Sequence, residues 1–427
     1  MRRWLTLKIL LSALIGLAAC SAIGAWMLLP GALPLTPAGT AGVSDAALIS
    51  RGRYLAAAGD CAACHTLPGG EPLAGGLGLN TPFGTIYAVN ITPDRQTGIG
   101  GWSQEAFDRA MRRGVSRDGH FLYPAMPYND YTRVSGADLR AIKAYLDTVP
   151  PVHRVNDSNR LPFPFNIRQM MLGWNFLFLD DTHFEDDPRH SAAWNRGRYL
   201  VDGLGHCAAC HTAKNLLGGD NAYLQGGTLE GWYAPEITGD ARLGLGRWSE
   251  AAIATYLGEG ANAHAVASGP MAEAVGKSLQ YLRRDDLLAI ATYLKTVPGS
   301  GTTGPTPLQA DEIGMRRGAR IYTLNCSACH GPAGEGVPDM VPSFAKAAAV
   351  QAPVPANLIR AVMNGGRGIG TQANPTGAGM PGFAWKLDDR QIADVLTYLR
   401  NSFGNGAAAV DEHTVTAMRA KTNRTSK

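Results

Sequence analysis

The stretch that decides the fold is CAACH at Cys61–His65, because it recurs letter for letter at Cys207–His211 and nearly unchanged, as CSACH, at Cys326–His330. Six of the seven cysteines in this chain of 427 residues belong to these three segments. The seventh, Cys20, lies in an apolar run near the N-terminus, so no cysteines remain for structural disulfides. The pattern predicts three copies of one site, whose cysteines have a chemical role.

A longer repeat surrounds each copy. Similar segments precede the three copies, RGRYL at 51–55 and 196–200 and RGARIY at 317–322. Similar segments also follow them, AYLDTVP at 144–150, TYLKTVP at 292–298 and TYLRNSF at 397–403. Apolar residues recur at helical spacing in these flanks, which predicts that each repeat begins and ends with a helix. We therefore expect a mainly α chain of three like domains.

The repeats set the expected domain boundaries. The three domains are predicted at residues 45–150, 190–298 and 311–404. The remaining segments are an N-terminal anchor or signal with its tether, an apolar connector, a linker and a polar tail without fixed structure, at residues 1–44, 151–189, 299–310 and 405–427. The connector includes LPFPFNIRQMMLGWNFLFL at 161–179, which either packs between the domains or forms a docking face for a partner or a membrane.

The CxxCH spacing predicts covalently attached haem. Two cysteines three residues apart on a helical turn can both form thioethers with the vinyl groups of one haem, and the adjacent histidine can bind its iron. A thioredoxin-like pair gives no reason for a histidine at the fifth position, and a zinc site needs two such pairs or distant histidines. We expect three haem c groups. The predicted thioethers are at Cys61, Cys64, Cys207, Cys210, Cys326 and Cys329, with axial ligands at His65, His211 and His330.

Methionines provide the expected second axial ligands. Met126, in YPAMPY, and Met271, in SGPMAEA, follow equivalent tryptophans at nearly the same distance, and Met380 lies in GAGMPGF. A methionine next to proline in a Gly/Pro loop is an unusual choice for core packing, and a thioether ligand suits electron transfer. His120 and His264 are the competing ligands in the first two domains. The third domain has no such histidine, which favours methionine throughout.

The N-terminus predicts export to a membrane. Arg2, Arg3 and Lys8 precede residues 9–29, which carry no charge and are long enough to span a bilayer. We expect a retained anchor that holds the chain on the periplasmic side of the inner membrane; a cleaved signal peptide and a lipoprotein acylated at Cys20 are the alternatives. The net charge is only +4, and no basic stretch is interleaved with aromatic residues, so nucleic acid is not an expected partner.

The chain resembles a known family over about residues 48–404. The resemblance rests on GRYLAAAGDCAACHT, NITPD, LYPAMPY, GHCAACHT and MPGFAWKLDD, which begin at residues 52, 90, 122, 205 and 380. Its members are the trihaem cytochrome c subunits of bacterial membrane-bound dehydrogenases, which are quinoprotein alcohol dehydrogenases or flavoprotein gluconate, sorbitol or fructose dehydrogenases. Similar chains also accompany molybdenum hydroxylases. The resemblance implies three tandem class I cytochrome c domains.

The resemblance also implies a role. In that family the subunit accepts electrons from a catalytic dehydrogenase subunit and passes them through its haems to ubiquinone, without oxidising the organic substrate itself. It implies the axial pairs His65 with Met126, His211 with Met271, and His330 with Met380. No catalytic residue is predicted. Two other hypotheses are a multihaem enzyme, such as a peroxidase or a thiosulfate-oxidising cytochrome, and a haem subunit that feeds a terminal oxidase.

Overall fold

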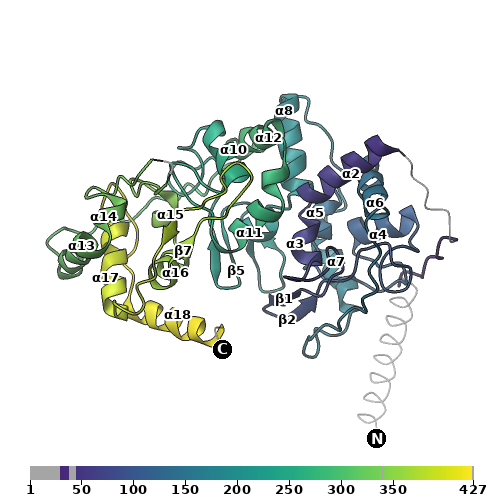
Figure 1. The fold of residues 1–427 in the computed structure, drawn as a ribbon, viewed down its shortest axis with the longest axis horizontal. Helices are drawn as coiled ribbons and strands as arrows, with labels where there is room; N and C mark the ends of the chain where they lie inside the picture. Colours follow the sequence, from purple (N-terminus) through teal and green to yellow (C-terminus); the bar gives the residue numbers. More distant parts are fainter. Residues whose placement is uncertain (1–28, 38–44, 339, 426–427) are drawn as a thin grey trace, which may run out of the picture.

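The computed structural model describes residues 29–37, 45–338 and 340–425 of the chain. Three helical units lie in a row, with the purple and blue N-terminal unit at one end and the yellow C-terminal unit at the other (Figure 1). The expected membrane helix over residues 9–29 falls outside the described residues, apart from Leu29. Among the residues that are described, no helix is both long and apolar enough to cross a bilayer.

The first unit runs from α2 to α6. Its elements are α2 Ala46–Ala58, α3 Cys61–His65, β1 Gly78–Thr81, β2 Gly84–Tyr87, α4 Gln104–Arg113, α5 Tyr128–Tyr131 and α6 Gly136–Leu146. Asp45 caps α2 by accepting hydrogen bonds from the Ala47 and Leu48 N–H groups. Helices α2 and α6 cross closely because Gly52 has no side chain; a Cβ there would overlap the Ala141 carbonyl. The crossing buries Leu55, Leu139 and Ile142 in one core.

The connector contains one helix, α7 Met170–Phe178. Tyr128 donates a hydrogen bond to Asn175 Oδ1 at 2.7 Å, and the Trp174 ring packs edge-on against Tyr128 and donates to the Leu217 carbonyl at 2.9 Å. No side chain of α7 is buried, and Phe176 is 88% exposed. The connector therefore packs on both neighbouring units with part of its apolar surface and leaves the rest open.

The second unit repeats the first. Its elements are α8 Ala192–Tyr199, the π-helical turn η1 Leu200–Leu204, α9 Ala208–His211, β3 Ala213–Lys214, β4 Asp220–Asn221, β5 Gly227–Leu229, β6 Trp232–Ala234, α10 Glu250–Glu259, α11 Gly269–Lys277, the 3₁₀ turn η2 Leu279–Tyr281 and α12 Arg284–Leu294. Helices α8 and α12 cross at Gly197, where a Cβ would overlap the Ala289 carbonyl. Ser249 caps α10, as Ser103 caps α4 in the first unit.

The third unit ends the chain. Its elements are α13 Ile313–Asn325, α14 Ser327–His330, α15 Ala348–Gln351, α16 Ala356–Asn364, β7 Gly366–Arg367, β8 Gly379–Met380, α17 Asp389–Arg400 and α18 Glu412–Thr425. Helices α13 and α17 cross at Gly318 in the same manner. In all three units the described strands form only two-stranded antiparallel ladders, so the fold is mainly helical as predicted.

The tail is a correction to the sequence analysis. Its polar composition predicted no fixed structure after residue 404, but α18 packs on α16 and α17. Val415 is fully buried in the core of the third unit, and Arg419 Nε lies 2.6 Å from Asp389 Oδ1. Arg419 also donates to the Ala384 and Leu387 carbonyls, so tertiary contacts hold this helix against the core, and a composition average does not reveal them.

Candidate haem-attachment sites

Each CxxCH segment forms a short helix directly after the first long helix of its unit. Segment 61–65 is helix α3 itself, and α9 and α14 begin one residue after Cys207 and Cys326. The long helices are held in place by their glycine crossings, so they fix where each attachment segment starts. All six cysteines of these segments are unpaired. Cysteines three apart on a helical turn point to the same side, as attachment to one haem requires.

The histidines of the first two segments are oriented in the same way. Nδ1 of His65 lies 2.6 Å from the Val89 carbonyl oxygen, and Nδ1 of His211 lies 2.6 Å from the Pro235 carbonyl oxygen. A carbonyl oxygen only accepts, so each Nδ1 carries the proton and donates it. The Nε2 lone pair of both rings is therefore available to a metal, which is the arrangement that a second partner imposes on metal-binding histidines.

The third histidine is held differently. His330 Nδ1 is buried and has no hydrogen-bond partner among the described residues, and its ring stacks on Phe344 with centroids 4.5 Å apart. Ring stacking replaces the carbonyl in fixing the plane of the imidazole. Burial lowers the pKa of all three histidines, so each ring favours the neutral form that binds iron.

The predicted methionine ligands lie on the same cores as the cysteines. Met126 and Cys61 pack against the core of the first unit, Met271 and Cys207 against that of the second, and Met380 and Cys326 against that of the third. Their local structures differ: Met126 is in a loop, Met271 is in the first turn of α11, and Met380 is in β8. The expected Gly/Pro loop is found for Met126 only, because Met380 pairs in a short strand and Met271 lies in a helix that begins at Gly269 with Pro270 in its first turn.

The competing histidines have other partners. His120 Nδ1 is 2.6 Å from Asp118 Oδ1, and the exposed His264 stacks on Trp248 with centroids 4.9 Å apart. Trp248 packs against the core of the second unit, so His264 is separated by one ring from the core that Cys207 and Met271 contact. His206, next to Cys207, faces the first unit, where its ring lies edge-on to Tyr131 at 5.9 Å.

The thiols do not have the environment of a redox dithiol. Burial raises the pKa of Cys61 and of Cys207 to about 12. Burial also raises the pKa of Cys64 to about 11, with further contributions from Asp60, Glu273 and Cys210. A thioredoxin-like cysteine needs the opposite shift, towards the thiolate. A pair of thiols and an oriented imidazole on one short helix, with a methionine on the core that the first cysteine contacts, is a donor set that fits a covalently attached haem.

The sequence analysis missed a set of tyrosines and aspartates between the first two units. Tyr199 of the second unit donates to Asp138 Oδ2 of the first at 2.6 Å, and Tyr54 of the first donates to Asp286 Oδ2 of the second. The only signal in the chain was the shared tyrosine of the two RGRYL segments, since the aspartates lie far away in the sequence.

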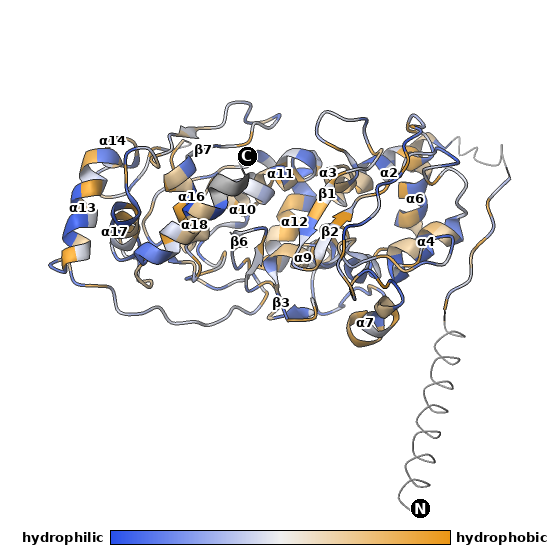
Figure 2. Ribbon diagram, turned by 90° about the horizontal axis from the view of Figure 1, so that it is seen from below, coloured by the Kyte–Doolittle hydropathy of each residue, from blue (hydrophilic) through white to orange (hydrophobic). Residues whose placement is uncertain are grey.

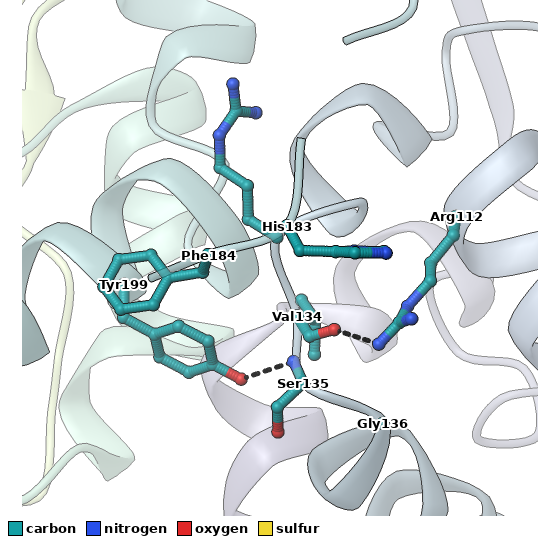
Figure 3. Close-up of a pocket in the computed structure, with 8 residues that line it drawn as sticks. Arg112, Val134, Ser135, Gly136, His183, Phe184 and Tyr199 are labelled. Carbon is teal, nitrogen blue, oxygen red and sulfur yellow. Dashed lines mark hydrogen bonds between the residues drawn. The ribbon is translucent and has the colours of Figure 1, made fainter. Parts of the chain in front are cut away.

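A cavity of about 200 Å³ lies beside one of these contacts, where the first unit, the connector and the second unit meet (Figure 3). Tyr199 Oη accepts from the Ser135 N–H at 3.0 Å, and Arg112 donates to the Val134 carbonyl at 2.6 Å. The cavity holds none of the predicted site residues. Its lining is Arg112, Arg133, Val134, Ser135, Gly136, His183, Phe184 and Tyr199.

Comparison with known proteins shows where this arrangement recurs. The family model "Cytochrome c" matches residues 195–298 and 315–403. The chain is 42% identical over 392 residues to the gluconate 2-dehydrogenase cytochrome c subunit of Pantoea cypripedii, covering 87% of this chain and 88% of that one. It is 39% identical over 404 residues to the fructose dehydrogenase cytochrome subunit of Gluconobacter japonicus, covering 87% and 82%.

A third relative is larger. The chain is 45% identical over 381 residues to one of the subunits of nicotinate dehydrogenase from Pseudomonas putida. The match covers 87% of this chain but only 31% of that relative, so this chain spans less than a third of its length.

Proposed function

Because this chain belongs to the family of cytochrome c subunits of bacterial dehydrogenases, we propose that it is a trihaem electron-transfer subunit. It accepts electrons from a membrane-bound dehydrogenase on the periplasmic side and passes them to ubiquinone or the respiratory chain. The observation that carries this proposal is the threefold recurrence of a CxxCH segment whose first cysteine packs against the same core as a methionine. The relatives are dehydrogenase cytochrome subunits, which disfavours a peroxidase, a thiosulfate-oxidising cytochrome or an oxidase subunit.

The residues have separate roles in this proposal. Bound haem supplies reversible one-electron exchange at its iron. The cysteine pairs would hold it permanently, at Cys61 and Cys64, Cys207 and Cys210, and Cys326 and Cys329. The residues that would bind the iron are His65 with Met126, His211 with Met271, and His330 with Met380. The Val89 and Pro235 carbonyls fix the first two imidazoles, and the apolar cores exclude water from the ligands.

The first unit is assigned by analogy with the other two. The family model covers the second and third units, and the first shares their attachment segment, glycine crossing and core arrangement. We therefore assign cytochrome c domains to residues 45–150, 190–298 and 311–404, with α18 added to the third. The partner is a quinoprotein, flavoprotein or molybdenum dehydrogenase that oxidises an alcohol, a sugar acid, a polyol or an aldehyde.

The open face of α7 supports attachment to a membrane. Figure 2 shows α7 at the lower edge of the molecule in that view. Segment 117–121 contacts both Arg168, two residues before this helix, and the first described residues of the chain: the Leu33 N–H donates to the Arg117 carbonyl at 2.7 Å, and Arg168 donates to the Phe121 carbonyl at 2.8 Å. The predicted anchor, residues 9–29, lies outside the described residues except for Leu29. We assign the exposed Phe176 and Leu177 to the lipid interface.

The test of the proposed function is made on the exported holoprotein. Its mass should exceed that of the polypeptide by three haems, and its reduced spectrum should show low-spin haem that does not bind carbon monoxide. Mixed with the dehydrogenase encoded beside it and with a ubiquinone analogue, it should carry electrons from the organic substrate to the quinone. A haem that binds carbon monoxide in the native protein, or a failure to be reduced by that dehydrogenase, contradicts the proposal.

A further inference from the structure

The first and second units meet through contacts that are exchanged between them. Tyr199 of the second unit accepts from the Ser135 N–H, at the N-cap of α6, and donates to Asp138 in the first turn of that helix. In return, Tyr54 of the first unit accepts from the Arg283 N–H, at the N-cap of α12, and donates to Asp286. Equivalent residues thus make equivalent contacts in both directions, which is the rule of a twofold, isologous interface.

Each aspartate also binds an arginine of its own unit. Arg51 Nε lies 2.8 Å from Asp138 Oδ1, and Arg196 Nε lies 2.8 Å from Asp286 Oδ1. Both carboxylates are almost fully buried, with side-chain exposures of 3% and 6%. A buried carboxylate that is held by an arginine is a fixed acceptor, so each tyrosine of the opposite unit meets it in one defined position.

The reciprocal contacts between the two units continue into the cores beside the attachment segments. Ala58, three residues before Cys61, belongs to the core of the second unit, and Leu204, three residues before Cys207, belongs to the core of the first. Gly59 faces Leu204 closely, so a Cβ on it would lie 3.4 Å from Leu204 Cδ2. The turns that lead into the two CAACH segments therefore pack against each other.

The third unit lacks the tyrosine and the aspartate of these reciprocal contacts. Aligned on the glycine crossings, Arg320 stands where the other units have Tyr54 and Tyr199, and Gln391 stands where they have the aspartates. Gln391 instead completes the capping box of its own helix with Asp388. The third unit joins the second by other contacts, such as Asn357 with the backbone of Tyr233 at 2.7 and 3.0 Å.

We propose that the crossed Tyr–Asp–Arg contacts make the first two units a twofold pair that holds their haem-attachment segments side by side for direct electron exchange. This inference rests on the proposed function and deepens it. The exchange moves one electron from a reduced to an oxidised haem, with no bond made and no proton transferred. Tyr54, Tyr199, Asp138 and Asp286 are positioning residues, because they act through the packing of the two units.

The test uses two optical signals of the holoprotein. Adjacent haems couple their Soret transitions and give a bisignate circular dichroism band, whereas the absorption of the methionine–iron bond reports each unit by itself. In the double variant Tyr54→Phe/Tyr199→Phe both rings stay, and all four hydrogen bonds of the two hydroxyls are lost. On heating, the bisignate band should disappear well before the methionine–iron absorption, and earlier than in the wild type. Tyr322→Phe, which removes a tyrosine hydroxyl bonded to Gly331 within the third unit, is the matched control.

Hydrogen exchange gives a second measurement at the contacts themselves. The Ser135 and Arg283 amides donate to the two tyrosine hydroxyls, so their exchange should accelerate by about tenfold or more in the double variant, because each amide loses its acceptor and each buried carboxylate loses the hydrogen bond from the opposite tyrosine. Exchange in the third unit should not change. Unaltered exchange at both amides, together with an unaltered melting of the bisignate band, overturns the positioning role.

The assignment to the first two haems has its own controls. Cys326→Ala/Cys329→Ala removes the third attachment and should keep the band, and Cys61→Ala/Cys64→Ala should abolish it. Met380→His, which changes the third site without removing it, should also leave the band intact and serves if the cysteine variants do not fold. If the wild type carries three attached haems but shows no bisignate band, the proposed twofold pair is refuted. The proposed electron-transfer function is not affected by that result.

Discussion

The glycine crossings allow a sharp test, because the third unit offers a matched pair of glycines on one helix. In α13, a Cβ on Gly318 would overlap the Asp394 carbonyl and lie 2.6 Å from Tyr398 Cβ, whereas a Cβ on Gly314 would have its nearest neighbour, Asp394 Oδ1, at an ordinary 3.5 Å. Non-bonded carbon atoms prefer separations of roughly 3.5–4.0 Å, so Gly318→Ala must push α13 and α17 apart by about 1 Å.

The two alanine substitutions should change the stability of the third unit in opposite directions. Overpacking of this kind costs about 1–3 kcal/mol, while alanine in place of glycine favours a helix by up to about 1 kcal/mol. Both variants gain the same helix propensity, so the free energy of opening of the third unit should be lower in Gly318→Ala than in Gly314→Ala by the overpacking cost alone, about 1–3 kcal/mol. This difference corresponds to roughly 5–150-fold faster exchange of the protected amides.

Native-state hydrogen exchange of the holoprotein measures the free energy of opening of each unit separately. It therefore suits a chain of several units better than a single melting curve. The amides of α13 and α17 should lose protection in Gly318→Ala, and those of the first unit should not. Equal protection in the two alanine variants would refute the reasoning, because the close crossing would then have no energetic consequence.

Three further predictions concern individual residues. Burial alone would raise the pKa of Asp286, but hydrogen bonds from its arginine and tyrosine partners lower it to about 2. This carboxylate should therefore add about 2 kcal/mol to the free energy of unfolding above pH 4, and this contribution should be lost as the pH falls towards 2. The stability of Asp286→Asn should not show this loss between pH 4 and pH 2. Phe176→Ser should weaken binding to lipid vesicles about tenfold or more, and Leu324→Ser, at an exposed site of the third unit, should not. Met271→Ala should abolish one methionine–iron absorption that His264→Ala leaves intact, and the reverse result would assign the histidine.

Part of the candidate site could be read directly from the chain. The CxxCH segments place two thiols and an imidazole within five residues, so covalent spacing alone brings them together on one helical turn. The equivalent hydrogen bonds of His65 and His211, and the absence of such a bond at His330 among the described residues, could not be read in this way. The acceptors at Val89 and Pro235 are 24 residues away and are reached only through the folded loop.

The sequence by itself determined the repeat, the attachment residues and the mainly helical class, because each depends on neighbours within one or two helical turns. The tertiary structure decided that α18 packs as part of the third unit, that Met271 lies on a helix, and that the first two units exchange tyrosines. Tyr54 and Asp286 are 232 positions apart. Such a contact depends on how three similar cores are stacked, and nothing in the local pattern of a repeat distinguishes the pair that interlocks from the unit that does not.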